Sequence, residues 1–174
     1  MSQMSTFLTH SIRALVITCL FAWSTGLSAQ IAVGEPPPDE IGTAEGEPVL
    51  LSNQTGIVQV VTFWASWCPP CRKELPVLAQ IQKQVGTDQL QIFAINFKED
   101  RRTFRKLSRK LEGLSDMVFL HDRKGIVGDA FGLEGLPFMI ILDREGNVAH
   151  IHTGYADSVV DTLVDELNTL LASQ

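Results

Sequence analysis

The chain has 174 residues, enough for one domain with a packed core behind an N-terminal segment and too few for two such domains. Its 20 acidic residues outnumber its 14 basic residues, and the net charge of −6 argues against nucleic acid as a partner. Of the three cysteines, Cys68 and Cys71 lie three positions apart, and Cys19 belongs to an apolar N-terminal run.

Residues 1–29 have the layout of an export signal. Arg13 is the only charged residue before Glu35, and an apolar run of about 14 residues follows it. This run is shorter than the roughly 20 residues of a membrane-spanning helix, and the small residue Ala29 suits a signal peptidase. We therefore predict a signal peptide over 1–29. Because Leu27 stands where a small residue is preferred, an uncleaved segment that acts as an N-terminal membrane anchor is the alternative.

Residues 30–48 have the composition of a disordered linker. They carry three consecutive prolines at 36–38 and five acidic residues, with no basic residue and no large apolar cluster. We therefore place the folded domain at 49–174 and expect residues 32–47 to lie outside its packed core.

From residue 49 onward, apolar runs alternate with helical patterns. The predicted elements, in chain order, are strand 57–64, helix 75–85, strand 90–97, helix 100–111, strand 117–120, strands 138–142 and 148–152, and helix 157–171. A Gly-Asn turn signal between the last two strands predicts a β-hairpin. This order predicts an α/β fold, a single domain in which a central mixed sheet is flanked by helices.

A Cys-Pro-Pro-Cys dithiol at residues 68–71 directly follows the first long strand. Two consecutive prolines suit only the first turn of a helix, which places Cys68 at the helix N-cap. There the helix dipole and unpaired amides stabilise a thiolate, the form that attacks disulfides. Cys71, one turn later, can resolve the mixed disulfide by attacking Cys68. We predict an exposed nucleophile, Cys68, and a shielded resolving residue, Cys71.

The alternatives for this cysteine pair are a static disulfide and half of a zinc site. A zinc site needs two further ligands at short spacing, and the sequence has no second cysteine pair. We expect neither a metal nor a cofactor.

The run Phe-Trp-Ala-Ser-Trp-Cys-Pro-Pro-Cys-Arg-Lys-Glu-Leu-Pro at 63–76 resembles the TlpA/ResA branch of thioredoxin-like proteins. The resemblance recurs at Gly135-Leu136-Pro137 and the strand after it. It implies a thioredoxin-like fold and an extracytoplasmic, often membrane-tethered reductant of protein disulfides, in the bacterial periplasm. The implied substrates are oxidised exported proteins, as in cytochrome c maturation or oxidase copper-site assembly. The implied electron donor is a thiol-disulfide protein of the membrane.

The same resemblance implies roles for residues outside the dithiol. Pro137 matches a cis-proline that faces the dithiol, and the backbone of the preceding Leu136 is expected to pair with a substrate segment. Phe138 departs from the family, in which threonine usually follows that proline. Glu74, three residues after Cys71, falls on the same side of the helix and is a candidate acceptor for the Cys71 proton.

For Glu74 a solvated position in an early helical turn is the alternative. Thioredoxin itself has a buried aspartate in the preceding strand, where this chain has Thr62, and Glu74 therefore becomes the better candidate base. Trp64 is interpreted as core, and Trp67 as a rim residue that contacts partners.

Two polar features are interpreted as solvated surface. His150 and His152 alternate on one strand face, and two ligands without a third favour solvent exposure over a metal site. Docking of an acidic partner or anionic lipid is the alternative for the cationic helix at 100–111. The basic residues are Lys98, which lies just before this helix, and, within it, Arg101, Arg102, Arg105, Lys106, Arg109 and Lys110.

Two other functions compete with reduction. One is a disulfide-forming oxidase, and it is disfavoured because the two prolines remove amides that would stabilise the Cys68 thiolate and hence the reduced form. The other is a copper-binding or metal-delivery module that uses Cys68, Cys71 and a histidine. It lacks the longer cysteine spacing and the Cys-Pro ending expected of thioredoxin-like copper chaperones.

Overall fold

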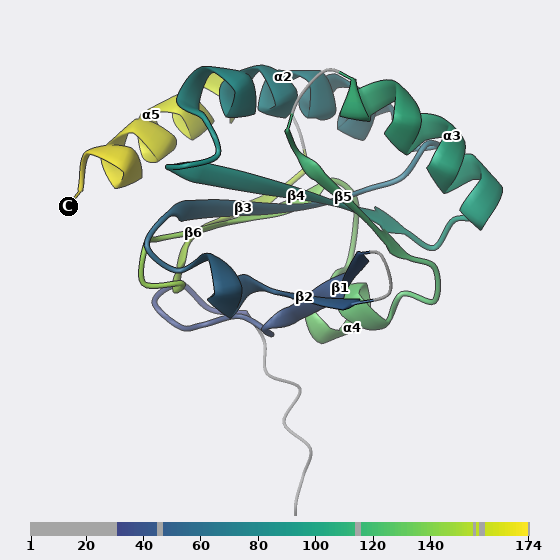
Figure 1. The fold of residues 1–174 in the computed structure, drawn as a ribbon, viewed down its shortest axis with the longest axis horizontal. Coiled ribbons are helices and arrows are strands. Elements are labelled where there is room, and N and C mark those ends of the chain that lie inside the picture. The colour runs from purple at the N-terminus through teal and green to yellow at the C-terminus, as the bar shows by residue number, and fades with distance from the viewer. Residues whose placement is uncertain (1–30, 45–46, 114–115, 155, 157–158, 174) are drawn as a thin grey trace, which may run out of the picture.

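The computed structural model describes residues 31–44, 47–113, 116–154, 156 and 159–173, so the predicted signal peptide lies outside the described residues. A five-stranded sheet in the order β5-β4-β3-β6-β7 forms its centre (Figure 1). The strands are β3 (Val58–Trp64), β4 (Leu90–Phe97), β5 (Val118–Asp122), β6 (Phe138–Leu142) and β7 (Val148–Thr153). The first three run parallel, and β6 is antiparallel to both of its neighbours, which makes the sheet mixed as predicted.

Helices cover both faces of the sheet, but unequally. The long helices α2 (Pro69–Val85), α3 (Arg101–Glu112) and α5 (Val159–Ala172) lie over one face (Figure 1). The short helix α4 (Ile126–Ala130) lies on the other face, next to a hairpin of β1 (Glu40–Ala44) and β2 (Glu47–Leu50) and the 3-10 turn η1 (Leu51–Gln54). None of the helices in the described part of the chain is long and apolar enough to cross a membrane.

Strand β3 is buried along its whole length because both of its faces are covered. Val60 and Trp64 point into the apolar cluster beneath the long helices, while Val61 and Phe63 point into the cluster beneath the hairpin and α4. Thr62 lies between Val61 and Phe63 in the strand and therefore faces the long helices. This alternation decides which side chains of the sheet meet α2.

The prediction that residues 30–48 form a disordered linker is wrong for the residues that the structure describes. Ile41 in β1 has no exposed surface and belongs to the cluster that contains Phe63. The backbone before β1 is also tied to the sheet, because Gly34 donates to the Val148 carbonyl (2.8 Å) and Val148 donates to the Glu35 carbonyl (3.0 Å). The composition of this stretch, rich in proline and acidic residues, does not reveal the single apolar residue Ile41, although its side chain fills the space between the hairpin and the sheet.

Ile41 should therefore contribute strongly to stability. We expect Ile41→Ala to lower the free energy of unfolding by about 3 kcal/mol, since it removes a fully buried side chain and leaves a cavity. Urea denaturation of the disulfide form measures the change. Val33→Ala is the matched control, because Val33 is 63% exposed and its truncation should cost less than about 0.5 kcal/mol. Equal small losses in both variants would restore the linker interpretation.

Candidate active site: a dithiol at a helix N-terminus

The two cysteines form a disulfide at the start of α2. The S–S distance is 2.01 Å and the two Cα atoms are 5.3 Å apart. Cys68 is the N-cap residue with extended backbone angles, and Pro69 and Pro70 occupy the first two helical positions, as the sequence predicts. The Cys71 amide donates to the Cys68 sulfur at 3.2 Å. The N-cap sulfur thus accepts the hydrogen bond that a thiolate would receive at this position.

Both cysteines are buried in the disulfide form, with exposed fractions of 3% for Cys68 and 1% for Cys71. The prediction of a shielded Cys71 is therefore confirmed in this form, and the prediction of an exposed Cys68 is wrong for it. The bond holds the Cys68 sulfur against Cys71, and both residues join the apolar cluster under the long helices. Trp67, which precedes the dithiol, is 65% exposed and lies at the rim as predicted, whereas Trp64 is buried in the core.

A carboxylate from the neighbouring strand end fixes the loop before the dithiol. Glu99 accepts from the Ser66 amide at 2.8 Å and forms a second, short hydrogen bond with the Ser66 hydroxyl. Asn96, buried at the end of β4, donates to the same carboxylate at 2.7 Å. Sequence reasoning missed this anchor, although a buried asparagine at the end of an apolar strand signals a local polar contact.

Glu74 is buried, with 3% of its surface exposed, and so the solvated alternative is wrong. Its carboxyl accepts a hydrogen bond from the Thr62 hydroxyl at 2.7 Å, across the gap between α2 and β3. Burial raises the pKa of Glu74 to about 7, while the Thr62 hydrogen bond and the positive charge of His152 oppose the rise. A carboxyl with a pKa near neutrality, one helical turn after Cys71, is suited to exchange a proton with a thiol.

The Leu136–Pro137 peptide bond is cis, as the resemblance implies. Phe138 pairs with Phe63, so Pro137 follows on beside Trp64, where β3 ends and the dithiol loop begins. Leu136 packs against the cluster that contains both cysteines. A cavity of about 480 Å³ adjoins the loop that leads into β6, not the dithiol loop. Its lining includes Phe131, Leu136, Pro137, Phe138, Ile151 and Thr153.

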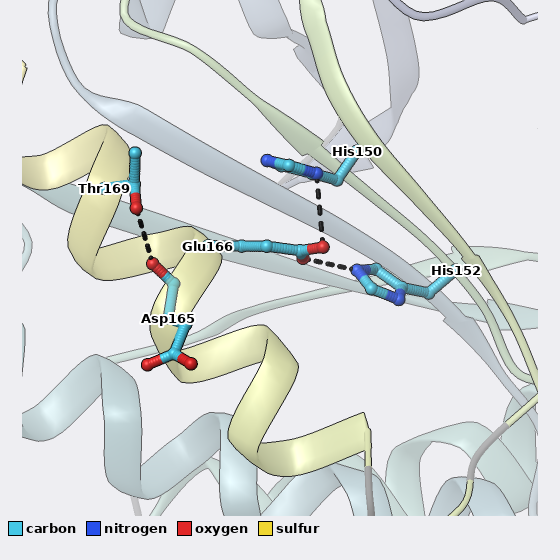
Figure 2. Close-up of polar contacts among 5 residues, drawn as sticks. All are labelled: His150, His152, Asp165, Glu166 and Thr169. Carbon is cyan, nitrogen blue, oxygen red and sulfur yellow. Dashed lines mark hydrogen bonds and ion pairs between the residues drawn. The ribbon is translucent and has the colours of Figure 1, made fainter.

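His150 and His152 point toward α5 and share one carboxylate (Figure 2). His150 Nδ1 lies 3.2 Å from Glu166 Oε1, and His152 Nε2 lies 2.7 Å from Glu166 Oε2. The interpretation as a solvated face is therefore wrong for His152, whose side chain is 15% exposed, whereas that of His150 is 36% exposed and stays partly in solvent. Glu166 was missed because only the packing of α5 on β7 brings it to the histidines. Among the described residues, no group of three or more metal-ligating side chains is arranged to hold an ion.

The cationic side chains of α3 are exposed, as the sequence predicts for a solvated helix face. Lys98, just before the helix, lies 3.5 Å from the Asp129 carboxylate, and both side chains are largely exposed.

Comparisons with known proteins agree with this geometry. The family model of the redoxins matches residues 32–170. The thioredoxin-like protein YneN of Bacillus subtilis is 34% identical over 71% of this chain and 73% of its own length. The thiol-disulfide oxidoreductase ResA of Geobacillus thermodenitrificans is 30% identical over 71% of each chain. A crystal structure from Chlorobium tepidum, assigned to the thiol:disulfide interchange protein DsbE, superposes with a TM-score of 0.72 at 27% identity, covering 82% of this chain and all of the other.

Proposed function

The chain belongs to the redoxin family and is a thiol-disulfide oxidoreductase of the ResA/DsbE type with a thioredoxin-like fold, and from this we propose that it reduces disulfides of exported proteins. The observation that carries the proposal is the position of the dithiol. Cys68 caps a helix whose first two residues lack amide protons, and the next turn carries a buried carboxyl of raised pKa.

The reaction proceeds in two exchanges at the dithiol. The Cys68 thiolate attacks one sulfur of the substrate disulfide, forming a mixed disulfide and releasing the other substrate sulfur as a thiolate. Glu74 takes the proton of the Cys71 thiol, and the Cys71 thiolate attacks the Cys68 sulfur. This closes the Cys68–Cys71 disulfide and releases the second substrate thiolate. Two electrons pass to the substrate, and a donor dithiol returns the protein to its reduced form by the reverse exchange.

Substrate binding is assigned to the surface beside the dithiol. The exposed Trp67 offers an apolar contact next to Cys68. The backbone of Leu136, before cis-Pro137, pairs with an extended substrate segment. Phe138, which replaces the usual threonine, is buried in the cluster on the opposite face of the sheet and so affects this grip only through the position of the loop.

The N-terminal sequence supports export, and we place the domain outside the cytoplasm, in the periplasm of a bacterium, released or held by an uncleaved N-terminal anchor. Its partners there are oxidised exported proteins, in cytochrome c maturation or oxidase copper-site assembly, and a membrane thiol-disulfide protein as electron donor. N-terminal sequencing of the exported product tests cleavage after Ala29.

The redox potential tests the direction of the reaction. A thiolate at an N-cap is stabilised chiefly by the amides of the second and third helical positions, and Pro70 has no amide proton to give. Among the described residues, only the Cys71 amide donates a hydrogen bond to the Cys68 sulfur. Because the thiolate is less stabilised than in strong oxidants, we expect a potential near or below about −200 to −270 mV, far from −120 mV. Equilibration with glutathione measures it, and a value near −120 mV would favour the oxidase.

A Pro70→Ala variant isolates the cause of this low potential. The restored amide adds one charge-assisted hydrogen bond to the thiolate, and the potential should rise by about 30 mV, the equivalent of roughly 1.4 kcal/mol. Pro76→Ala, in the same helix but away from the N-cap, is the control and should leave the potential unchanged.

A titration of the reduced protein with copper separates both oxidoreductase functions, reductase and oxidase, from the metal-delivery alternative.

A further inference from the structure

One row of side chains links the dithiol helix to the histidine pair. Thr62, Met139 and His152 are register partners across β3, β6 and β7, so their side chains project from the same face of the sheet. Helices α2 and α5 cover that face. Thr62 holds Glu74 of α2 at one end of the row, and His152 holds Glu166 of α5 at the other.

The imidazole of His152 is fixed and shielded from solvent. Its Nε2 atom lies 2.7 Å from the Glu166 carboxylate, and the exposed fractions of the two side chains are 15% and 18% (Figure 2). His150 contacts the other oxygen of the same carboxylate at 3.2 Å and is 36% exposed. A charge in such a partly buried place acts over a longer distance than one in water.

Few charged groups face Glu74 among the described residues. Cys71 lies on its own helix, His150 and His152 on β7, and Glu166 on α5. The remaining charges of these elements near it point to solvent, namely Arg72, Lys73, Asp161 and Asp165. His150 pairs with Ile141, level with Val60, and so lies two residues farther along the strands than His152. His152 is therefore level with Thr62, the hydrogen-bond partner of Glu74, whereas His150 is displaced along the strand.

We propose that His152, held in place by Glu166, is a positioning residue for the resolving step: when protonated, it favours the ionised form of Glu74, the form that accepts the Cys71 proton. This inference rests on the proposed function of Glu74. Burial raises the pKa of the Glu74 carboxyl and so favours its protonated form. The hydrogen bond from Thr62 and the positive charge of His152 lower this pKa. Without that charge, fewer molecules at neutral pH would hold a base ready beside Cys71.

The test replaces His152 with glutamine, which keeps a side chain able to donate to Glu166 and removes the charge. Glu74 is titrated in the disulfide form by NMR of the ¹³C-labelled side-chain carboxyl. We expect the midpoint of His152→Gln to lie about one pH unit above that of the wild type. His150→Gln is the matched control and should shift the midpoint by less than half as much. An unchanged or lowered midpoint in His152→Gln overturns the proposal.

The kinetic readout uses the reduced protein and the chromogenic disulfide DTNB. The first equivalent of thiolate is released when Cys68 attacks, and the second when Cys71 resolves the mixed disulfide. In His152→Gln the pH midpoint of the second phase should rise with that of Glu74, while the first phase keeps its pH dependence. His152→Lys, which restores a positive charge, should return both midpoints toward the wild-type values. If His152→Lys does not restore the midpoints, the shifts in His152→Gln come from altered packing and the proposal fails.

The two readouts separate this inference from the function on which it rests. A shifted Glu74 midpoint with an unmoved second phase removes Glu74 from the resolving step, and the proposal that His152 positions that step falls with it. An unmoved Glu74 midpoint in a protein that still reduces DTNB in two phases rejects His152 alone and leaves the dithiol function standing.

Discussion

A Cys71→Ala variant is expected to stop after the first exchange and to accumulate mixed disulfides with its substrates. Cys68 keeps its N-cap position, so it can still attack, but no thiol remains one turn later to release the product. Multiple turnover should fall to the rate of exchange with free thiols in solution. Separation on non-reducing gels followed by mass spectrometry identifies the captured proteins, whose identities assign the pathway.

The reciprocal variant supplies the control for trapping. Cys68→Ala retains Cys71, which is buried under the start of the helix, and should capture no substrate. Capture by Cys68→Ala that exceeds capture by Cys71→Ala would reverse the assigned roles, and equal capture would reject them. Capture by Cys71→Ala would also show that the Cys68 sulfur, buried in the disulfide form, becomes accessible when the bond is absent, because a buried sulfur cannot reach a protein disulfide.

Features that depend on neighbours in sequence were predictable. Two prolines after Cys68 leave the first helical turn as their only place, and the structure has Cys68 at the N-cap. The continuous apolar run of β3 predicted a strand buried on both faces, and the turn residues between β6 and β7 predicted their hairpin. The cis bond before Pro137 came from resemblance, since X-Pro bonds alone favour trans.

Features that depend on distant segments were not predictable from these patterns. The spacing of Glu74 from Cys71 gave its side of the helix, but its burial follows from packing on Thr62, twelve positions earlier. Glu166 meets His152 only because α5 lies across β7. Ile41 is one apolar residue in a stretch of acidic and proline-rich composition, and only the hairpin it belongs to brings it into the core. Polar pairs formed by tertiary packing leave no periodic signal in the sequence.

Glu74→Gln is expected to make the protein more stable at alkaline pH while slowing its resolving step. The folded-state pKa of Glu74 is raised from 4.5 to about 7, so between these values the folded protein holds a proton that the unfolded chain has released. Stability therefore falls as the pH rises from 4.5 to 7, by about 3 kcal/mol once both limits are passed. Glutamine is neutral throughout and can still accept the Thr62 hydrogen bond, so this loss disappears.

Urea denaturation of the disulfide form at pH 4 and pH 8 measures the effect. Relative to wild type, Glu74→Gln should gain about 3 kcal/mol more at pH 8 than at pH 4, whereas Glu145→Gln, at an exposed carboxyl, should show no such difference. A difference that does not change with pH would mean that Glu74 ionises as easily in the folded protein as in the unfolded chain. The second phase of thiolate release from DTNB should meanwhile slow by about a hundredfold, the usual contribution of one general base. If the substitution raises stability and slows the resolving step, the carboxyl is retained for chemistry. Substitution of a group kept only for packing would lower both stability and rate, or change neither.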